Sequence, residues 1–60
     1  MTDKVPGKVL DFRINEEAKI ELLMKWKYLS LEYSSWVLYE HYKDYYFVKT
    51  YYLKYIKKIK

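Results

Sequence analysis

Residues 8–17 read KVLDFRINEE, and this stretch decides the fold that the sequence predicts. Every second residue from position 10 is apolar, namely Leu10, Phe12 and Ile14. The charged side chains of Asp11 and Arg13 alternate with them. A period of two is typical of a strand with one buried face and one solvated face. We therefore expect a short strand over residues 8–14.

The strand pattern ends at Asn15, where the sequence changes to a signal for the start of a helix. Asn15 can cap a helix, and the carboxylates of Glu16 and Glu17 would then lie in the first turn, where the helix dipole favours negative charge. At 100° per residue, four apolar side chains of residues 16–29 fall within an arc of about 80°. They are Ala18, Leu22, Trp26 and Leu29. The sequence predicts a helix over residues 16–29.

A break near residues 29–35 separates this helix from a second helical pattern. Either Ser30 or Ser34 could cap the second helix, and the sequence does not choose between them. From Trp36 onward, apolar residues recur at spacings of three and four, and neither Gly nor Pro interrupts the chain before Lys60. We expect a second helix that begins by Trp36.

Residues 47–60 form an amphipathic basic helix in this interpretation. They contain five lysines and no carboxylate, so they carry more than the whole formal net charge of +4. On a helical wheel the lysines occupy one half. An arc of about 140° in the other half holds Val48, Tyr51, Tyr52, Tyr55, Ile56 and Ile59. The sequence leaves open whether this segment continues the second helix or follows a bend.

The composition limits the classes of protein that this chain can belong to. With 60 residues, no Cys and one His, it excludes disulfide-linked domains and cysteine zinc sites. A chain of this length buries about 60% of the surface that its unfolded form exposes, so we expect one domain, stabilised as a homodimer. No motif indicates a catalytic nucleophile, a phosphate loop or a metal cluster, so the sequence predicts neither an enzyme nor a cofactor.

Two further features concern the location of the protein. The amino-terminal residues contain no apolar run of the kind found in signal peptides. Charged residues interrupt every stretch well before the roughly 20 apolar residues that a spanning helix needs. We therefore expect an intracellular, cytoplasmic protein.

The order of strand, helix, turn and helix resembles the ribbon-helix-helix superfamily of the Arc and MetJ repressors. Residues 9–17 are similar to the family's strand running into its first helix, and residues 29–37 to its inter-helix turn and the start of its second helix. The resemblance implies a mainly α fold with one short N-terminal strand, in which two chains pair their strands into a ribbon. Residues 1–7 would then be a flexible lead, 8–46 the ribbon-helix-helix core and 47–60 a basic helical extension.

Family members insert the paired ribbon into the DNA major groove, so the resemblance implies roles for individual residues. The outward-facing residues of the ribbon would be Val9, Asp11 and Arg13. Arg13 would bond guanine, Asp11 would accept a hydrogen bond from cytosine, and Val9 would touch a thymine methyl group. Backbone amides at the start of the second helix would hold a phosphate, at Tyr33, Ser34 and Ser35. The lysines of the extension that we expect on phosphates are Lys54, Lys57 and Lys58.

These observations predict a homodimeric, sequence-specific protein that binds double-stranded DNA and acts as a small transcriptional repressor. A protein partner, such as the toxins that accompany some family members, is compatible with this role. Two alternatives stay open. One is a small dimeric helical interaction protein whose ribbon serves only for assembly. The other is a peripheral membrane binder that lays its basic helix on an anionic lipid surface, which we rank below DNA as a partner.

Overall fold

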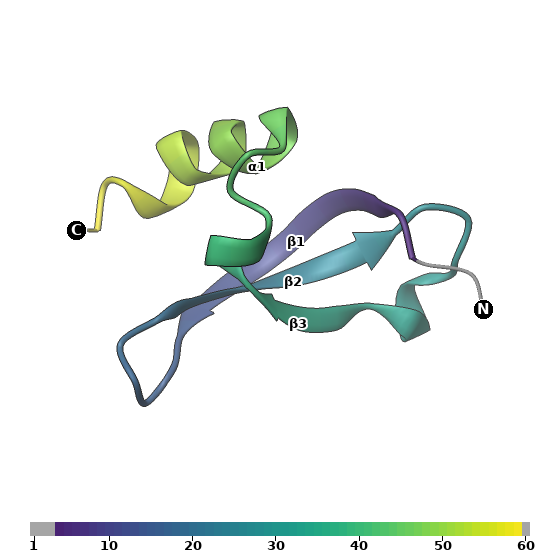
Figure 1. The fold of residues 1–60 in the computed structure, drawn as a ribbon, viewed down its shortest axis with the longest axis horizontal. Helices are drawn as coiled ribbons and strands as arrows, with labels where there is room; N and C mark the ends of the chain where they lie inside the picture. The colour runs from purple at the N-terminus through teal and green to yellow at the C-terminus, as the bar shows by residue number, and fades with distance from the viewer. Residues whose placement is uncertain (1–3, 60) are drawn as a thin grey trace.

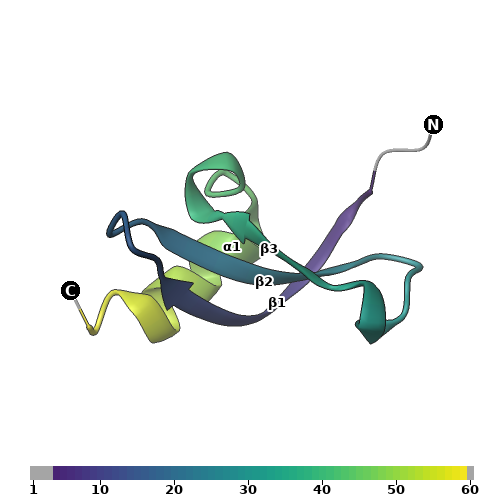
Figure 2. The same ribbon diagram turned by 90° about the horizontal axis from the view of Figure 1, so that it is seen from below.

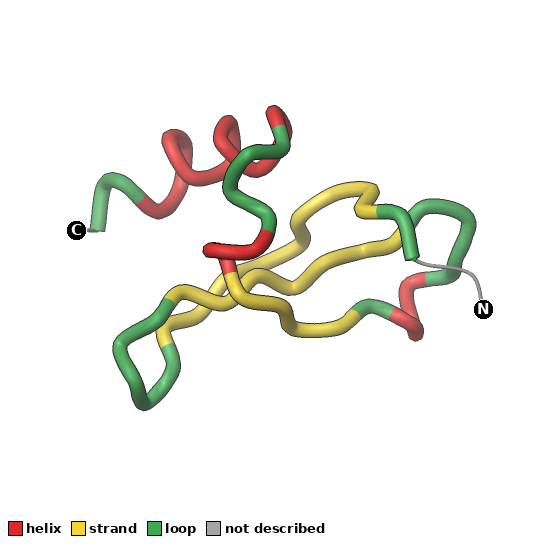
Figure 3. The backbone as a smooth tube through the Cα atoms, viewed as in Figure 1, coloured by secondary structure: helices red, strands yellow, loops and turns green. Residues whose placement is uncertain are grey.

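The computed structural model describes residues 4–59 and shows a three-stranded sheet followed by a C-terminal helix (Figure 1). The antiparallel sheet has the order β1-β2-β3 and consists of β1 (Pro6–Ile14), β2 (Ile20–Trp26) and β3 (Ser35–Leu38). Two short 3-10 helices flank β3, namely η1 (Leu31–Tyr33) and η2 (Tyr39–His41). Helix α1 (Tyr46–Tyr51) runs directly into a π-helix, η3 (Tyr52–Ile56). Figure 3 shows how the strands dominate the first two thirds of the chain.

Strand β1 confirms that the expected strand exists and extends it by two residues at its start. Its expected buried face is wrong in part, because Val9 and Phe12 pack against the core and Ile14 is 50% exposed. It pairs with β2 of the same chain, for example at Phe12 and Leu22, so a hairpin within one chain takes the place of the expected two-chain ribbon. Of the expected flexible lead, residues 1–3 lie outside the described residues, and Pro6 and Gly7 belong to β1. A Cβ atom on Gly7 would lie 2.8 Å from the carbonyl oxygen of Lys25, so this close approach of two strands requires glycine.

The expected helix over residues 16–29 is wrong, because Asn15 organises a hairpin loop instead. Its side-chain oxygen accepts hydrogen bonds from the backbone N–H groups of Glu17 and Lys19, at 2.9 and 3.0 Å. Its own N–H donates to the carbonyl of Lys19 at 2.9 Å, which closes the loop. Ala18 has a φ of 64°, the left-handed conformation that three-residue hairpin loops use at this place. The residue type that favours a helix cap therefore also favours this turn.

Strand β2 uses an alternating pattern that coexists with the helical one in the same residues. The side chains that face the helix are Ile20, Leu22, Met24 and Trp26. Leu22 and Trp26 are four residues apart, a spacing that lies on one face of a helix and equally on one face of a strand. The neighbouring β1 supplies backbone hydrogen-bond partners over its whole length, and this pairing selects the strand.

The second expected helix is also wrong between residues 36 and 45. Trp36 lies in β3, where it pairs with Leu23 of β2. Neither Ser30 nor Ser34 caps an α-helix, and both flank the short η1. Residues from Tyr46 to Ile56 are helical, so the C-terminal part of the predicted pattern does form a helix. The fold is therefore a small antiparallel sheet with one C-terminal helix, and not the mainly α fold that the sequence predicts.

The core lies between the helix and one face of the sheet, as Figures 1 and 2 show together. Leu22 and Met24 of β2 have no exposed surface, and Val48 and Ile56 of the helix are each 1% exposed. Burying side chains of this size stabilises the fold by roughly 1.5–3 kcal/mol each. The helix thus packs through two residues that are eight positions apart, and it leaves the opposite face of the sheet uncovered.

Candidate functional site

The three residues expected on the DNA-reading face of a ribbon do not share a face in the structure. Val9 packs against the core, while Asp11 and Arg13 are exposed. Arg13 is engaged within the chain, because its Nε lies 2.6 Å from a carboxylate oxygen of Glu21 and its guanidinium lies 4.0 Å from the ring centre of Trp36. The single outward face expected for these three residues is therefore wrong.

The phosphate clamp expected at residues 33–35 is also wrong, because no α-helix begins there. The N–H of Tyr33 donates to Ser30, and that of Ser34 donates to the carbonyl of Leu31 at 2.9 Å. The side-chain oxygen of Ser34 is buried and has no partner among residues 4–59. Ser35 belongs to β3, and its hydroxyl accepts a hydrogen bond from the indole of Trp26 at 3.1 Å. The N–H groups of Tyr33 and Ser34 and the hydroxyl of Ser35 are therefore used within the fold.

The lysines of the C-terminal segment are exposed, as expected. Lys54 lies on η3, and Lys57 and Lys58 lie in the turns that follow it. Every charged residue between positions 46 and 59 is a lysine. This end of the molecule therefore presents positive charge with no carboxylate from the same segment to neutralise it.

A shallow groove of about 230 Å³ lies between β1 and the helix, and it combines lysines with aromatic rings. We call it the lysine groove, and its lining residues are Lys8, Val9, Phe47, Thr50, Tyr51, Lys54 and Tyr55. Lys8 comes from β1 and Lys54 from η3, so two lysines far apart in the sequence line one groove. None of its lining residues is acidic. The groove can therefore hold an anion that also carries flat apolar surface.

The rings of the lysine groove are held by contacts with one another. Tyr51 and Tyr55 have ring centres 4.7 Å apart, and Phe12 of β1 packs edge-on to Tyr51 at 6.3 Å. Burial, followed by the charge of Asp11 and the neighbouring Tyr55, raises the pKa of Tyr51 above its ordinary value. The Tyr51 hydroxyl can donate a hydrogen bond to an anionic oxygen. Asp11 is the carboxylate that limits the positive potential near this groove.

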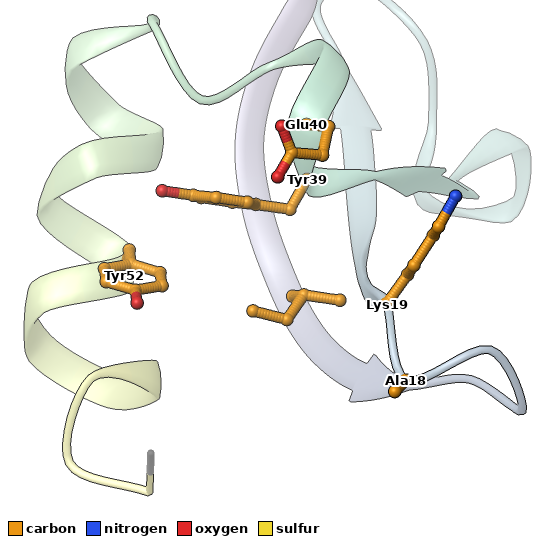
Figure 4. Close-up of a pocket in the computed structure, with 6 residues that line it drawn as sticks. Ala18, Lys19, Tyr39, Glu40 and Tyr52 are labelled. Carbon is orange, nitrogen blue, oxygen red and sulfur yellow. The ribbon is translucent and has the colours of Figure 1, made fainter.

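A second hollow, of about 480 Å³, lies between the β1–β2 hairpin, η2 and the helix (Figure 4). We call it the tyrosine pocket, and its lining residues are Ala18, Lys19, Ile20, Tyr39, Glu40 and Tyr52. The rings of Tyr39 and Tyr52 stack on each other at 5.1 Å. Burial, with a smaller effect of Tyr52, raises the pKa of Tyr39. Lys19 and Glu40 bring opposite charges to this pocket, so it has no charge preference comparable to that of the lysine groove.

Other kinds of site find less support in the part of the chain that the structure describes. Residues 4–59 contain no cluster of three or more His, Cys, Asp or Glu side chains placed to hold a metal ion. Within the same residues, none of the helices combines the length and the apolar character needed to cross a membrane. Comparison with family models, with curated proteins and with solved structures finds no match for this chain.

Of the residues that line the lysine groove, the sequence predicts only Val9 and Lys54 as candidate site residues, and Lys57 and Lys58 are not part of its lining. The sequence places Lys8 only at the start of the expected strand, and it predicts no binding role for Tyr51 or Tyr55. Nothing in the local sequence around Lys8 indicates that it meets Lys54, because their proximity depends on how the helix crosses β1. The tyrosine-rich composition, with nine Tyr in 60 residues, is the signal that could have directed attention to an aromatic surface.

Proposed function

We propose that this protein binds nucleic acid through the lysine groove and the exposed lysines beside it. The observation that carries the proposal is that Lys8 and Lys54 line one groove together with Tyr51 and Tyr55, with no acidic residue in the lining. Lysines neutralise phosphates and release bound counterions, while tyrosine rings offer a surface on which bases can stack. The two kinds of group together match the two parts of a nucleotide.

This proposal keeps the class of partner expected from the sequence and changes the mode of binding. Insertion of a two-chain ribbon into the major groove is not part of it, because β1 pairs with β2 within the chain. The expected homodimer stays a prediction, and the free edges of β1 and β3 are available for pairing with a second chain. A cytoplasmic location, where nucleic acid is accessible, belongs to the same proposal.

The membrane alternative is weaker than the nucleic-acid proposal on one specific observation. It needs the apolar stripe of the C-terminal helix to face lipid. Val48 and Ile56, which belong to that stripe, are instead buried against the sheet. The lysines remain exposed, but the apolar partner that an interfacial helix requires is already used in the core.

Fluorescence anisotropy with labelled single-stranded and duplex oligonucleotides of random sequence tests the proposal. We expect binding at about 50 mM salt that weakens as salt rises. The double variant Lys54→Gln/Lys57→Gln should lower the slope of log affinity against log salt by about 1.4 on single strands or about 1.8 on duplex. The matched control is Lys19→Gln/Lys27→Gln, which removes the same charge at the other loops of the sheet and should change the slope less.

Two results would overturn the proposed function. One is the absence of binding to every oligonucleotide at low salt. The other is an equal loss of slope in the test and control variants, which would show that binding follows net charge alone and has no defined surface.

A further inference from the structure

The π-helical stretch η3 changes which side chains of the C-terminal helix face the sheet. The N–H of Lys57 donates to the carbonyl of Tyr52, five residues back, at 2.8 Å. In a regular α-helix Tyr55 would lie within about 20° of Val48, and Ile56 would lie about 80° away from it. The structure shows the reverse order of burial, because Ile56 is 1% exposed and Tyr55 is 47% exposed. The π-helix thus buries Ile56 and turns Tyr55 outward.

Tyr55 is held in this outward position by an ordered series of rings. Phe12 supports Tyr51, and Tyr51 supports Tyr55. The ammonium of Lys54 lies 5.6 Å from the ring centre of Tyr55. A half-exposed ring and a cation therefore stand next to each other, within the reach of one nucleotide. Single-turn π-helices are frequent at functional sites, which agrees with a role for the ring that this one exposes.

We infer that the lysine groove selects single-stranded over double-stranded nucleic acid, with an unpaired base stacked on Tyr55 and its flanking phosphates beside Lys54 and Lys8. The inference rests on the proposed function and adds the class of nucleic acid. Bases in a duplex have both faces covered by neighbouring pairs, so a tyrosine ring in a groove reaches only a base that is free of the stack. Lysines alone would favour the duplex, because its charge density is higher. The ring therefore supplies the selectivity.

The test compares the binding of a labelled oligothymidylate of about twelve nucleotides with that of a duplex of the same length, at equal salt. Tyr55→Leu removes the ring, Tyr55→Phe keeps it, and Tyr33→Leu changes an exposed tyrosine at η1, away from the helix. We expect Tyr55→Leu to weaken oligothymidylate binding about 5- to 150-fold. Its effect on the duplex should be less than about twofold, because the duplex contacts only the lysines. Tyr55→Phe and Tyr33→Leu should bind the oligothymidylate as the natural chain does.

Failure of this inference differs from failure of the proposed function. If the natural chain binds the duplex as tightly as the oligothymidylate, or if Tyr55→Leu weakens neither, the single-strand inference is wrong while binding through lysines stands. If no oligonucleotide binds, the proposed function itself is wrong. Circular dichroism of each variant identifies a loss of fold, and the behaviour of Tyr55→Phe separates the ring from the hydroxyl if Tyr55→Leu does not fold.

Discussion

On the face of the sheet that the helix covers, Leu22 and Met24 have no exposed surface, whereas on the opposite face Arg13, Glu21 and Trp36 remain in contact with water. The covered face is apolar and closes through Val48 and Ile56. The uncovered face is joined by an ion pair and by the contact of a guanidinium with an indole ring. Both faces arise from one hairpin. The comparison indicates that apolar burial on the covered face is the main source of stability. The polar contacts of the open face link β1 to β2 and β3 at the surface.

The largest effect should come from the covered face. Ile56→Ala removes a fully buried side chain and should reduce the free energy of unfolding by about 2–5 kcal/mol, measured by urea denaturation. Ile56→Val should reduce the free energy of unfolding by about 0.5–1.5 kcal/mol, and it can replace Ile56→Ala in this test if that variant does not fold. The matched control is Ile59→Ala, since Ile59 is three residues further along and mostly exposed. Equal effects at positions 56 and 59 would contradict the burial order that the π-helix produces.

A smaller effect should come from the uncovered face. The guanidinium of Arg13 lies 4.0 Å from the ring centre of Trp36, at a side chain that is half exposed. A double-mutant cycle with Arg13→Met and Trp36→Leu should give a coupling energy of about 0.5–1 kcal/mol. A coupling as large as the loss in Ile56→Ala would mean that the two faces contribute alike. A coupling energy of zero would show that this contact does not contribute to the stability of the fold.

The smallest effect concerns pH. Hydrogen bonds from Asn15 and then Arg13 lower the pKa of Glu21, which lies at the surface. Because the pKa is lower in the folded chain, the stabilisation is present above the ordinary value of about 4.3 and is lost as the pH falls through the folded value. Carboxyl NMR titration should give a midpoint below the ordinary value, and Arg13→Met should move it upward. If stability falls in the same way at low pH in the natural chain and in Glu21→Gln, the lowered pKa of Glu21 is not the cause of that loss.

The presence of the first strand could be predicted from the alternation of Leu10, Phe12 and Ile14, but its buried face could not. The strand register shifts between Val9 and Asp11, so Val9 and Phe12 pack against the core while Ile14 is 50% exposed. The hairpin could not be predicted, since Asn15 followed by two glutamates suits a helix start as well as a turn. In β2 the pair Leu22 and Trp26 satisfies both periods, and only the presence of β1 decides between them. A local sequence pattern therefore does not predict secondary structure where the same residues fit both a helix and a strand. In β2, pairing with β1 selects the strand.

The candidate site shows the same limit. The exposure of Lys54, Lys57 and Lys58 follows from the wheel, because lysines gather on the half of the helix opposite the apolar side chains. The position of Tyr55 does not follow, because a regular wheel places it at the centre of the buried stripe. Its exposure depends on the π-helix, and Lys8 reaches the same groove only through the packing of the helix on β1.

The π-helix also determines how the chain tolerates a change in length. Val48 and Ile56 are eight residues apart and both face the sheet. In an uninterrupted α-helix, residues seven apart are separated by about 700°, only about 20° short of two full turns. A chain that lacked the exposed Leu53 would therefore bring the same two side chains to the core through a regular α-helix. The present helix is equivalent to a regular one with a single inserted residue. The insertion allows Val48 and Ile56 to face the sheet together while Tyr55 faces solvent.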